Sequence, residues 1–426
     1  MWIDFHHCLR FFFRIVGGLS ILYSTLGLSS EVTTVSAAKA YSAPITNAER
    51  QLYWGDTHLH TTQSADAFIL GSRLNREAAW RFARGETVET ENGIPVRLRR
   101  PLDFLAVTDH AEYLGVFPRL EANDAALFDW ALGREMADLM RKGKDLELAK
   151  LFSELIQSTE AAKRTPPALR QPIWNAVGAS ADKWYVPGQF TTLIGYEWTS
   201  MVSGDNLHRV VLFRDDATLT NRQLPYSAQD STDPEDLWNH LAAYEAQTPG
   251  QVLAIAHNGN VSNGRMFSPV RENGAALDGD YARARSRWEP IYEVTQVKGD
   301  GETHPLLSPL DPFADFETWD DGNINLTAEK SPDMLPNEYA RSALKQGLSH
   351  AQTLGANPFQ FGMIGSSDLH TALTTTEEDN YFGKFVHDGP APGRTQLKMA
   401  QQLQKVWRLV SSGLAKNPTT PSARPS

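Results

Sequence analysis

The fold class is indicated most clearly by one stretch of the chain, Leu102-Asp103-Phe104-Leu105-Ala106-Val107-Thr108-Asp109-His110. A short apolar run with branched side chains is typical of a strand buried on both faces. Here the run passes directly into Asp109 and His110, and the end of a buried strand is a costly place for polar groups without partners. The pattern therefore indicates a functional site, the alternative being an ordinary turn in which Asp109 is satisfied and His110 caps the chain.

Three further apolar runs end in the same way. Residues 190–196 precede Glu197, residues 252–256 precede His257, and residues 361–365 lead through two serines to Asp368-Leu369-His370. These runs also have the length of buried strands. Several strands that each end in polar residues predict that those residues meet at one edge of a sheet.

Helical patterns separate the predicted strands. We expect helices over residues 75–83, 124–163, 237–246 and 337–353, the third introduced by an N-cap at Asp233 and a proline at Pro234. Strands that alternate with helices predict the α/β class with a mostly parallel sheet, in which chemistry collects at the carboxyl ends of the strands. The candidate site residues fall at those ends.

The N-terminus has the layout of a secretory signal peptide. Arg10 and Arg14 precede an apolar stretch over residues 15–28, and small residues follow near Ala38 and Ala40. The stretch is shorter than a usual membrane span, although an uncleaved anchor is the alternative. We therefore expect a periplasmic or secreted protein without a stable membrane span after cleavage. Cys8, the only cysteine, would be lost, which excludes a thiol nucleophile and a disulfide scaffold.

The remaining chain divides by composition. We expect a signal peptide over residues 1–40, a linker over 41–52, and one folded domain over 53–395 with a helical insertion at about 124–187. A C-terminal amphipathic helix is expected over 396–415. Residues 416–426, rich in Pro, Ser and Thr, have the composition of a disordered tail.

The overall charge limits the class of partner. The net charge is −11 and the isoelectric point is near 5.6, so no general field attracts nucleic acid or an anionic membrane. A nuclease is further disfavoured because no basic stripe with interleaved aromatic residues is present. A small anionic substrate must then be held by local positive charge.

Two short motifs have the spacing of metal ligands. On an extended segment, alternate residues point to the same side, so His58 and His60 can reach one ion, as can Asp368 and His370. Asp66 follows His60 six residues later. A mixture of imidazole and carboxylate suits Mn, Fe or Zn better than Ca or Mg. One isolated H-x-H motif could equally be an ordinary surface or core pair.

Each of the other candidate metal ligands is ambiguous when taken alone, but together they give stronger evidence for one site. Glu197 could bridge two cations or form a salt bridge, and His208 and His257 alone could be structural. Six of the ten histidines outside the signal peptide, however, lie in these motifs. We therefore predict one metal site from nine residues: His58, His60, Asp66, His110, Glu197, His208, His257, Asp368 and His370.

The ordered series H-x-H-x5-D, T-D-H, G-x-E, H, A-H and S-D-x-H resembles the polymerase and histidinol phosphatase (PHP) family of metal-dependent phosphoesterases. Residues 55–61, 195–198 and 383–385 are similar to a bacterial branch long catalogued only as a domain of unknown function. The resemblance covers residues 53–390, with Asp66 where many members have histidine. It implies a distorted (β/α)7 barrel and a trinuclear site.

The resemblance also implies how the ligands divide. His58, His60, Glu197 and Asp368 would hold one metal, and Glu197 would bridge to a second held by His208 and His257. Asp66, His110 and His370 would hold the third, while Asp109 would orient a ligand. Relatives in that branch continue well beyond the last motif, so the resemblance also suggests a C-terminal truncation in this chain.

These features together predict a hydrolase. Clustered dications create a hydroxide nucleophile near neutral pH and neutralise ester oxygens, so we expect two to three Mn, Fe or Zn ions and attack of metal-bound hydroxide on a phosphate ester. Glu197, Asp109 and Lys298 are the predicted catalytic residues, and Lys298 and Arg265, with Arg209 a weaker candidate, would bind the substrate. Solvated loop charges are the alternative for these basic residues.

Other activities stay open at this stage. Sulfate, sulfonate or phosphonate esters present a similar array of oxygens. An exported metal-binding or metal-storage protein without catalysis, or a structural relic of an enzyme, would need the same ligands.

Overall fold

The computed structural model describes residues 52–156, 158–375 and 377–391 of the 426-residue chain. The predicted signal peptide, C-terminal helix and tail lie outside the described residues, as does all of the predicted linker except residue 52. Within the described part, no helix has the length and apolar character that a bilayer crossing requires.

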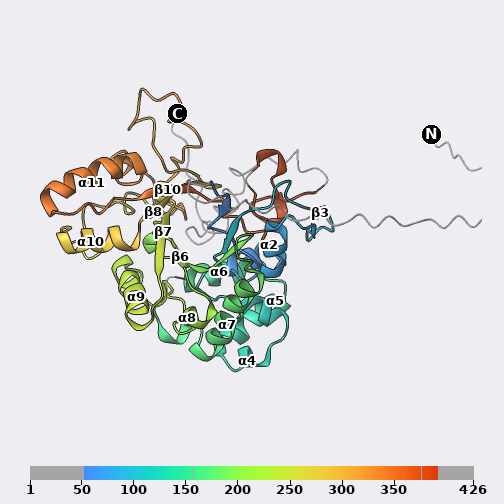
Figure 1. Cartoon of the computed structure of the whole chain (residues 1–426). Helices are drawn as coiled ribbons and strands as arrows, with labels where there is room; N and C mark the ends of the chain where they lie inside the picture. The colour runs from blue at the N-terminus through green and yellow to red at the C-terminus, as the bar shows by residue number, and fades with distance from the viewer. Residues whose placement is uncertain (1–51, 157, 376, 392–426) are drawn as a thin grey trace, which may run out of the picture. The chain divides into compact units, whose positions relative to one another are not determined.

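One mixed sheet forms the centre of the fold (Figure 1). Its strands, in spatial order, are β1 (Gly55–Asp56), β4 (Phe104–Val107), β5 (Thr191–Trp198), β6 (Arg209–Phe213), β7 (Val252–His257), β8 (Ile291–Gln296) and β10 (Gly362–Gly365), and β9 (Gly299–Asp300) pairs with β8. All pairings along this order are parallel except those of β6, which is antiparallel to both neighbours. The predicted α/β class with a mostly parallel sheet is confirmed.

The segments that follow β1 and β10 bring the sheet close to a closed barrel. Leu59 and Leu369 form a parallel bridge. The amide of His60 donates to the carbonyl of Leu369 at 2.9 Å, and the amide of Asp368 donates to the carbonyl of His58 at 2.9 Å. The two segments that join the first and last strands are therefore the two with the H-x-H and D-x-H motifs, so barrel closure fixes their spacing.

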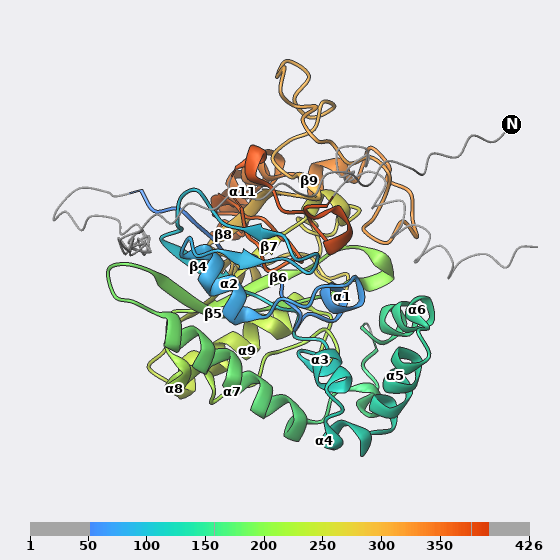
Figure 2. The same ribbon diagram turned by 90° about the vertical axis from the view of Figure 1, so that its right-hand side faces the viewer.

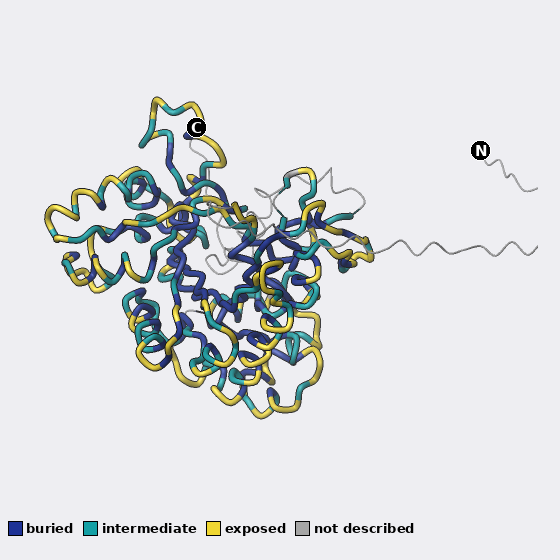
Figure 3. Tube along the Cα trace, in the orientation of Figure 1, coloured by how far each residue is buried: buried dark blue, intermediate teal, exposed yellow. Residues whose placement is uncertain are grey.

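Apolar side chains from the strands pack together inside the sheet. Ala106, Val210, Leu212 and Ile255 form one buried cluster, joined by partly buried side chains from β5, β8 and β10. Figure 3 shows the strands as the buried centre, with exposed positions on the outer turns of the helices. This packing holds the strand ends, and with them the site residues, in a fixed arrangement.

Helices surround the sheet. Their bounds are α1 (Ala65–Ile69), α2 (Arg76–Ala83), α3 (Val116–Glu121), α4 (Ala125–Phe128), α5 (Ala131–Arg141), α6 (Asp145–Leu155), α7 (Pro167–Trp184), α8 (Ala217–Thr220), α9 (Pro234–Gln247), α10 (Gly279–Trp288) and α11 (Ala340–Leu354). A two-stranded hairpin of β2 (Val88–Glu89) and β3 (Pro95–Val96) lies apart from the main sheet. Figure 2 shows α3 to α6 gathered to one side of the strands.

The helix predictions have mixed outcomes. The predicted helices over residues 75–83 and 237–246 are confirmed as α2 and α9, and the Asp233 side chain caps α9 by accepting from the amide of Glu235 at 2.9 Å. The helix predicted from residue 337 begins at Ala340, because a short 3-10 turn occupies Leu335–Asn337.

The prediction of one long helix over residues 124–163 is wrong. The segment instead forms α4, α5, α6 and a 3-10 turn at Ala161–Lys163. Gly143, at a φ of +60°, lies between α5 and α6 in a conformation that ends a helix. The separate helices fold back and bury their apolar faces in a cluster of their own, which a single straight helix could not do.

The predicted end of β5 is also wrong. The strand continues past Tyr196 through Glu197 and Trp198, because both residues pair with β6. Glu197 is therefore held on both sides, by β6 and by a bridge to His110.

A buried ion cluster joins β6 to the outer helices. Glu289 accepts from Arg209 Nε at 2.9 Å and from the Trp238 indole at 2.9 Å, and it lies 3.3 Å from Arg285 Nε. Burial acts to raise the pKa of Glu289, but the charges of Arg209 and Arg285 outweigh it and hold that pKa below its usual 4.5. The cluster therefore stabilises the fold only while Glu289 is ionised.

Glu289→Gln should destabilise the protein by roughly 3–5 kcal/mol at pH 7, because it leaves two buried guanidinium groups without their carboxylate. The lowered pKa means that the contribution is present above pH 4.5 and is lost as the pH falls through the folded-state pKa. The difference in free energy of unfolding between the parent and the variant, measured by urea denaturation, should shrink below pH 4.5.

The control is Asp280→Asn, which breaks an exposed pair with Arg283 on the same helix α10. Its effect should stay below about 1 kcal/mol. A Glu289→Gln effect no larger than this control would contradict the assignment.

Candidate metal centre

All nine predicted ligands lie at one edge of the sheet. Most follow or end parallel strands, and Asp66 comes from the first turn of α1. His208 is different, because it precedes its strand, β6. Since β6 is antiparallel to its neighbours, its beginning lies at the edge where β5 and β7 meet it with their carboxyl ends. The reversed strand thus adds a histidine to the cluster from the opposite chain direction.

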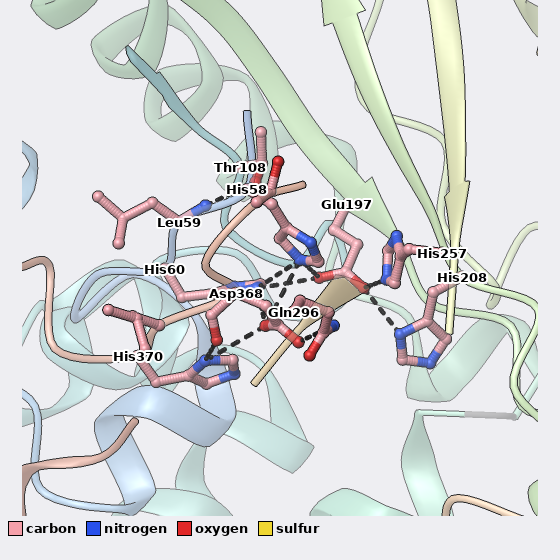
Figure 4. Close-up of polar contacts among 12 residues, drawn as sticks. His58, Leu59, His60, Thr108, Glu197, His208, His257, Gln296, Asp368 and His370 are labelled. Atoms are coloured by element: carbon pink, nitrogen blue, oxygen red, sulfur yellow. Dashed lines mark hydrogen bonds and ion pairs between the residues drawn. The ribbon is translucent and has the colours of Figure 1, made fainter. Parts of the chain in front are cut away.

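Glu197 lies at the centre of the cluster and is only 1% exposed. Five imidazoles surround its carboxylate, and Figure 4 shows four of them, those of His58, His60, His208 and His257. The nitrogens nearest Oε2 are His58 Nε2 at 3.3 Å, His60 Nε2 at 3.1 Å and His110 Nδ1 at 3.2 Å; those nearest Oε1 are His208 Nδ1 at 2.7 Å and His257 Nε2 at 3.0 Å. The two oxygens therefore face two different sets of histidines.

Two aspartates complete the set. Asp66 Oδ2 lies 2.8 Å from His370 Nε2 and 3.3 Å from His110 Nε2. Asp368 Oδ1 lies 3.5 Å from His58 Nε2 and 3.3 Å from His60 Nε2. Asp368 has a φ of +51°, a backbone conformation that is costly for this residue and is found mainly at functional sites.

Asp109 acts on this cluster through a neighbour. It accepts hydrogen bonds from the Ser64 hydroxyl at 3.0 Å and from the Thr61 amide at 2.7 Å, and it pairs with the buried Arg76 at 3.1 Å. Ser64 donates its only hydroxyl proton to Asp109, so it accepts from His60 Nδ1 at 2.8 Å. The chain Asp109–Ser64–His60 therefore leaves the Nε2 lone pair of His60 turned toward Glu197, which is how a metal-binding histidine is usually held.

Glu293 holds His58 in the same way, a role that we did not predict from the sequence. Its carboxylate is buried on β8 and lies 3.1 Å from His58 Nδ1. Charge in the middle of the apolar run 291–297 was the signal available in the sequence, because an unpaired carboxylate is rarely buried there.

The donor atoms suit metal ions. Four sets of three side chains place their nitrogen and oxygen atoms within 4.8 Å of one another, and every member is buried: His60, His110 and His370; His58, His257 and Glu293; His58, His60 and Glu197; and Glu197, His208 and His257. His208 Nε2 and His257 Nδ1 are buried without a hydrogen-bond partner among the described residues. These buried groups could hold metal ions.

Charge at the site is distributed unevenly. Burial lowers the pKa of His60 and of His257 to about 4, which leaves both imidazoles neutral near pH 7. Burial also acts on His58, but the charges of Glu293 and Glu197 outweigh it and raise the pKa of His58 to about 9. A cation entering the cluster would have to displace the proton that His58 holds near pH 7, so metal binding should weaken as the pH falls.

Two lysines lie beside the cluster. Lys298 pairs with Asp368 Oδ2, and Lys384 Nζ lies 2.9 Å from Asp368 Oδ1 and 2.9 Å from His370 Nδ1. Burial lowers the pKa of Lys384 to about 7, and burial with the charge of Lys384 lowers the pKa of Lys298. Both line one cavity of about 520 Å³ together with Asp66, His110, Glu197, His208, Asp368 and His370.

The two predicted arginines lie elsewhere. Arg265 pairs with Glu272 and lies 3.7 Å from Asp205, and it does not line this cavity. Arg209 belongs to the buried cluster around Glu289. We did not predict Lys384 as a site residue, although its place in the Gly-Lys-Phe motif at residues 383–385 could have indicated it.

Comparison with known proteins adds one match. A family model described as "Protein of unknown function (DUF3604)" covers residues 47–423. No curated protein matches the chain.

Glu197→Gln should weaken the binding of a divalent transition metal by at least about 10-fold, because the amide keeps the shape but loses the charge between two sets of imidazoles. Calorimetric titration of the metal-stripped protein with Zn²⁺ or Mn²⁺ measures this directly. His240→Gln is the matched control, since His240 lies on α9 and contacts Leu224, Gln223 and Tyr226, which do not belong to the cluster. Equal affinities for parent and Glu197→Gln would show that Glu197 is not a ligand.

Proposed function

We propose that this chain, which belongs to the DUF3604 family, is a metal-dependent hydrolase that cleaves phosphate esters. One observation supports the proposal above the others. A buried carboxylate shared by five imidazoles forms the floor of a cavity that two lysines also line. Imidazoles and carboxylates of this kind suit Mn, Fe or Zn, and the lysines suit an anion beside the cations.

We further propose that the barrel is the distorted (β/α)7 barrel of the PHP family and that the site is trinuclear. Most of the contacts divide as such a site would require, and His110 also faces Glu197 Oε2. Glu197 Oε2 faces His58 and His60, Glu197 Oε1 faces His208 and His257, and Asp66 faces His110 and His370. Asp368, close to His58 and His60, would complete the first group.

When bound, the cations would supply an activated water nucleophile near neutral pH and charge neutralisation for the ester oxygens. The protein's own groups have separate tasks. Glu197 joins two groups of ligands, while Asp109, through Ser64, and Glu293 fix the ring orientation of His60 and His58. Each of these residues would act by positioning.

Lys298 and Lys384 would bind the ester. Both amino groups line the cavity and share Asp368, whose carboxylate would be drawn toward a cation when metal is present. Each lysine would then be available to a non-bridging oxygen of the substrate. A site built only for metal storage has no need of two lysines and an open cavity, so these residues favour catalysis over storage.

The protein reconstituted with Mn²⁺, Fe²⁺ or Zn²⁺ should hold two to three ions per chain and hydrolyse p-nitrophenyl phosphate. Elemental analysis and release of p-nitrophenol measure the two quantities on one sample. His60→Ala should lose at least about 10-fold in activity because it removes a ligand at the centre, whereas His350→Ala on α11 should match the parent.

Three results would contradict the proposal. Less than one ion per folded chain would remove the metal site itself. Full metal content without hydrolysis of the p-nitrophenyl phosphate, sulfate or phosphonate ester would indicate a metal-binding protein. Faster hydrolysis of the sulfate ester than of the phosphate ester would make a sulfate ester the substrate.

A further inference from the structure

The cavity above the candidate metal centre is polar at its floor and mainly apolar in its wall. Its volume of about 520 Å³ is that of a site for a drug-sized ligand, much larger than a phosphate group alone needs. Phe152 and Ile156 line one side, and Trp319, Ile324 and Leu326 line another. The floor is formed by the histidines, carboxylates and lysines described above.

Part of the apolar wall comes from two segments outside the barrel strands, and Met201, Val261, Val297, Tyr381 and Phe385 supply the rest. Phe152 lies in α6, which with Ile156 belongs to the helical segment between β4 and β5. Trp319, Ile324 and Leu326 lie in the long connection between β9 and α11. Neither segment is needed to close the sheet. Barrel closure therefore does not explain why both segments line the same cavity.

Core packing explains only part of this wall. Phe152 and Ile156 belong to the apolar cluster of the helical segment. Ile324 and Leu326, in contrast, are half-buried and belong to none of the apolar clusters formed by the described residues. Their burial is therefore incomplete on the side of the cavity, where an apolar ligand could complete it.

Local details support a ligand-facing role for this connection. Leu326 has a φ of +53°, a strained conformation for a leucine. The Trp319 indole nitrogen donates to the carbonyl of Gly322 at 2.9 Å, so the ring has its polar atom satisfied and offers the cavity its apolar surface.

We propose that the substrate is a phosphate monoester whose organic part is bulky and apolar, an aryl or branched alkyl group. Its phosphate lies at the floor with Lys298 and Lys384, and its organic part lies against Phe152, Ile324 and Leu326. This inference rests on the proposed function, since it names the substrate of the same site. A small polar ester would fill the floor and leave the apolar wall in contact with water.

The reaction consumes one water. The water oxygen forms a new bond to phosphorus, the ester P–O bond breaks with its electron pair on the departing oxygen, and a water proton ends on the released alcohol or phenol. The apolar wall therefore holds the group that becomes this product.

The test compares two phosphonates that cannot be hydrolysed, (1-naphthylmethyl)phosphonate and methylphosphonate, by calorimetry on the full chain reconstituted with metal. The two compounds share the same charged phosphonate group, so the difference between their affinities measures the contribution of the apolar wall. We expect the naphthylmethyl compound to bind at least about 10-fold more tightly.

Ile324→Ser and Leu326→Ser should each weaken binding of the naphthylmethyl compound by about 10-fold or more and change that of methylphosphonate by less than about twofold. Leu310→Ser is the matched control, because Leu310 lies in the same connection, is 96% exposed and does not line the cavity. It should leave both affinities unchanged.

The outcomes separate this inference from the proposed function. Equal affinities for the two phosphonates, or equal losses in Ile324→Ser and Leu326→Ser for both compounds, would overturn the apolar subsite while leaving hydrolysis possible. Preferential binding of the naphthylmethyl compound without turnover of any ester would support the subsite and count against hydrolysis. Absence of binding by either compound would overturn both.

Discussion

The structure depends on one electrostatic constraint, the burial of the Glu197 carboxylate. An ionised carboxylate removed from water costs several kcal/mol unless nearby positive charge and hydrogen bonds compensate it. Here the five surrounding imidazoles come from four separate segments of the chain, so compensation requires those segments to meet. Protons can satisfy this carboxylate in part, as the raised pKa of His58 to about 9 shows, but dications would satisfy both oxygens at once.

Barrel closure and site formation are the same structural event. The bridge between Leu59 and Leu369 joins the first and last strands, and each leucine lies between two candidate ligands. The reversed β6 then brings His208 to the edge reached by the carboxyl ends of its neighbours. Because backbone hydrogen bonds fix both arrangements, the sheet itself positions the cluster. Phe152, Ile324 and Leu326 of the cavity wall, by contrast, lie in segments outside the sheet.

The sequence predicted features that depend on local pattern. The strand end at His257 and those shortly before His110 and Asp368 followed from apolar runs that stop at polar residues, and the α9 N-cap followed from Asp233 and Pro234. Features set by tertiary contacts were not predictable in this way. The break at Gly143 depends on helices packing on one another, and the roles of Glu293 and Lys384 depend on which side chains the barrel places beside them. Arg209 was misread because its carboxylate partner, Glu289, lies 80 residues away in the chain.

The most direct test of the central claim is anomalous X-ray diffraction from crystals of the chain reconstituted with Zn²⁺ or Mn²⁺, recorded on both sides of the metal absorption edge. We expect anomalous peaks on both sides of the Glu197 carboxylate, each at about 2.0–2.3 Å from a carboxylate oxygen and the facing imidazole nitrogens. A peak at only one oxygen would retain a metal site but refute the bridge. No peak within the cluster, with Glu197 hydrogen-bonded directly to its histidines in the metal-soaked crystal, would show that Glu197 holds no metal.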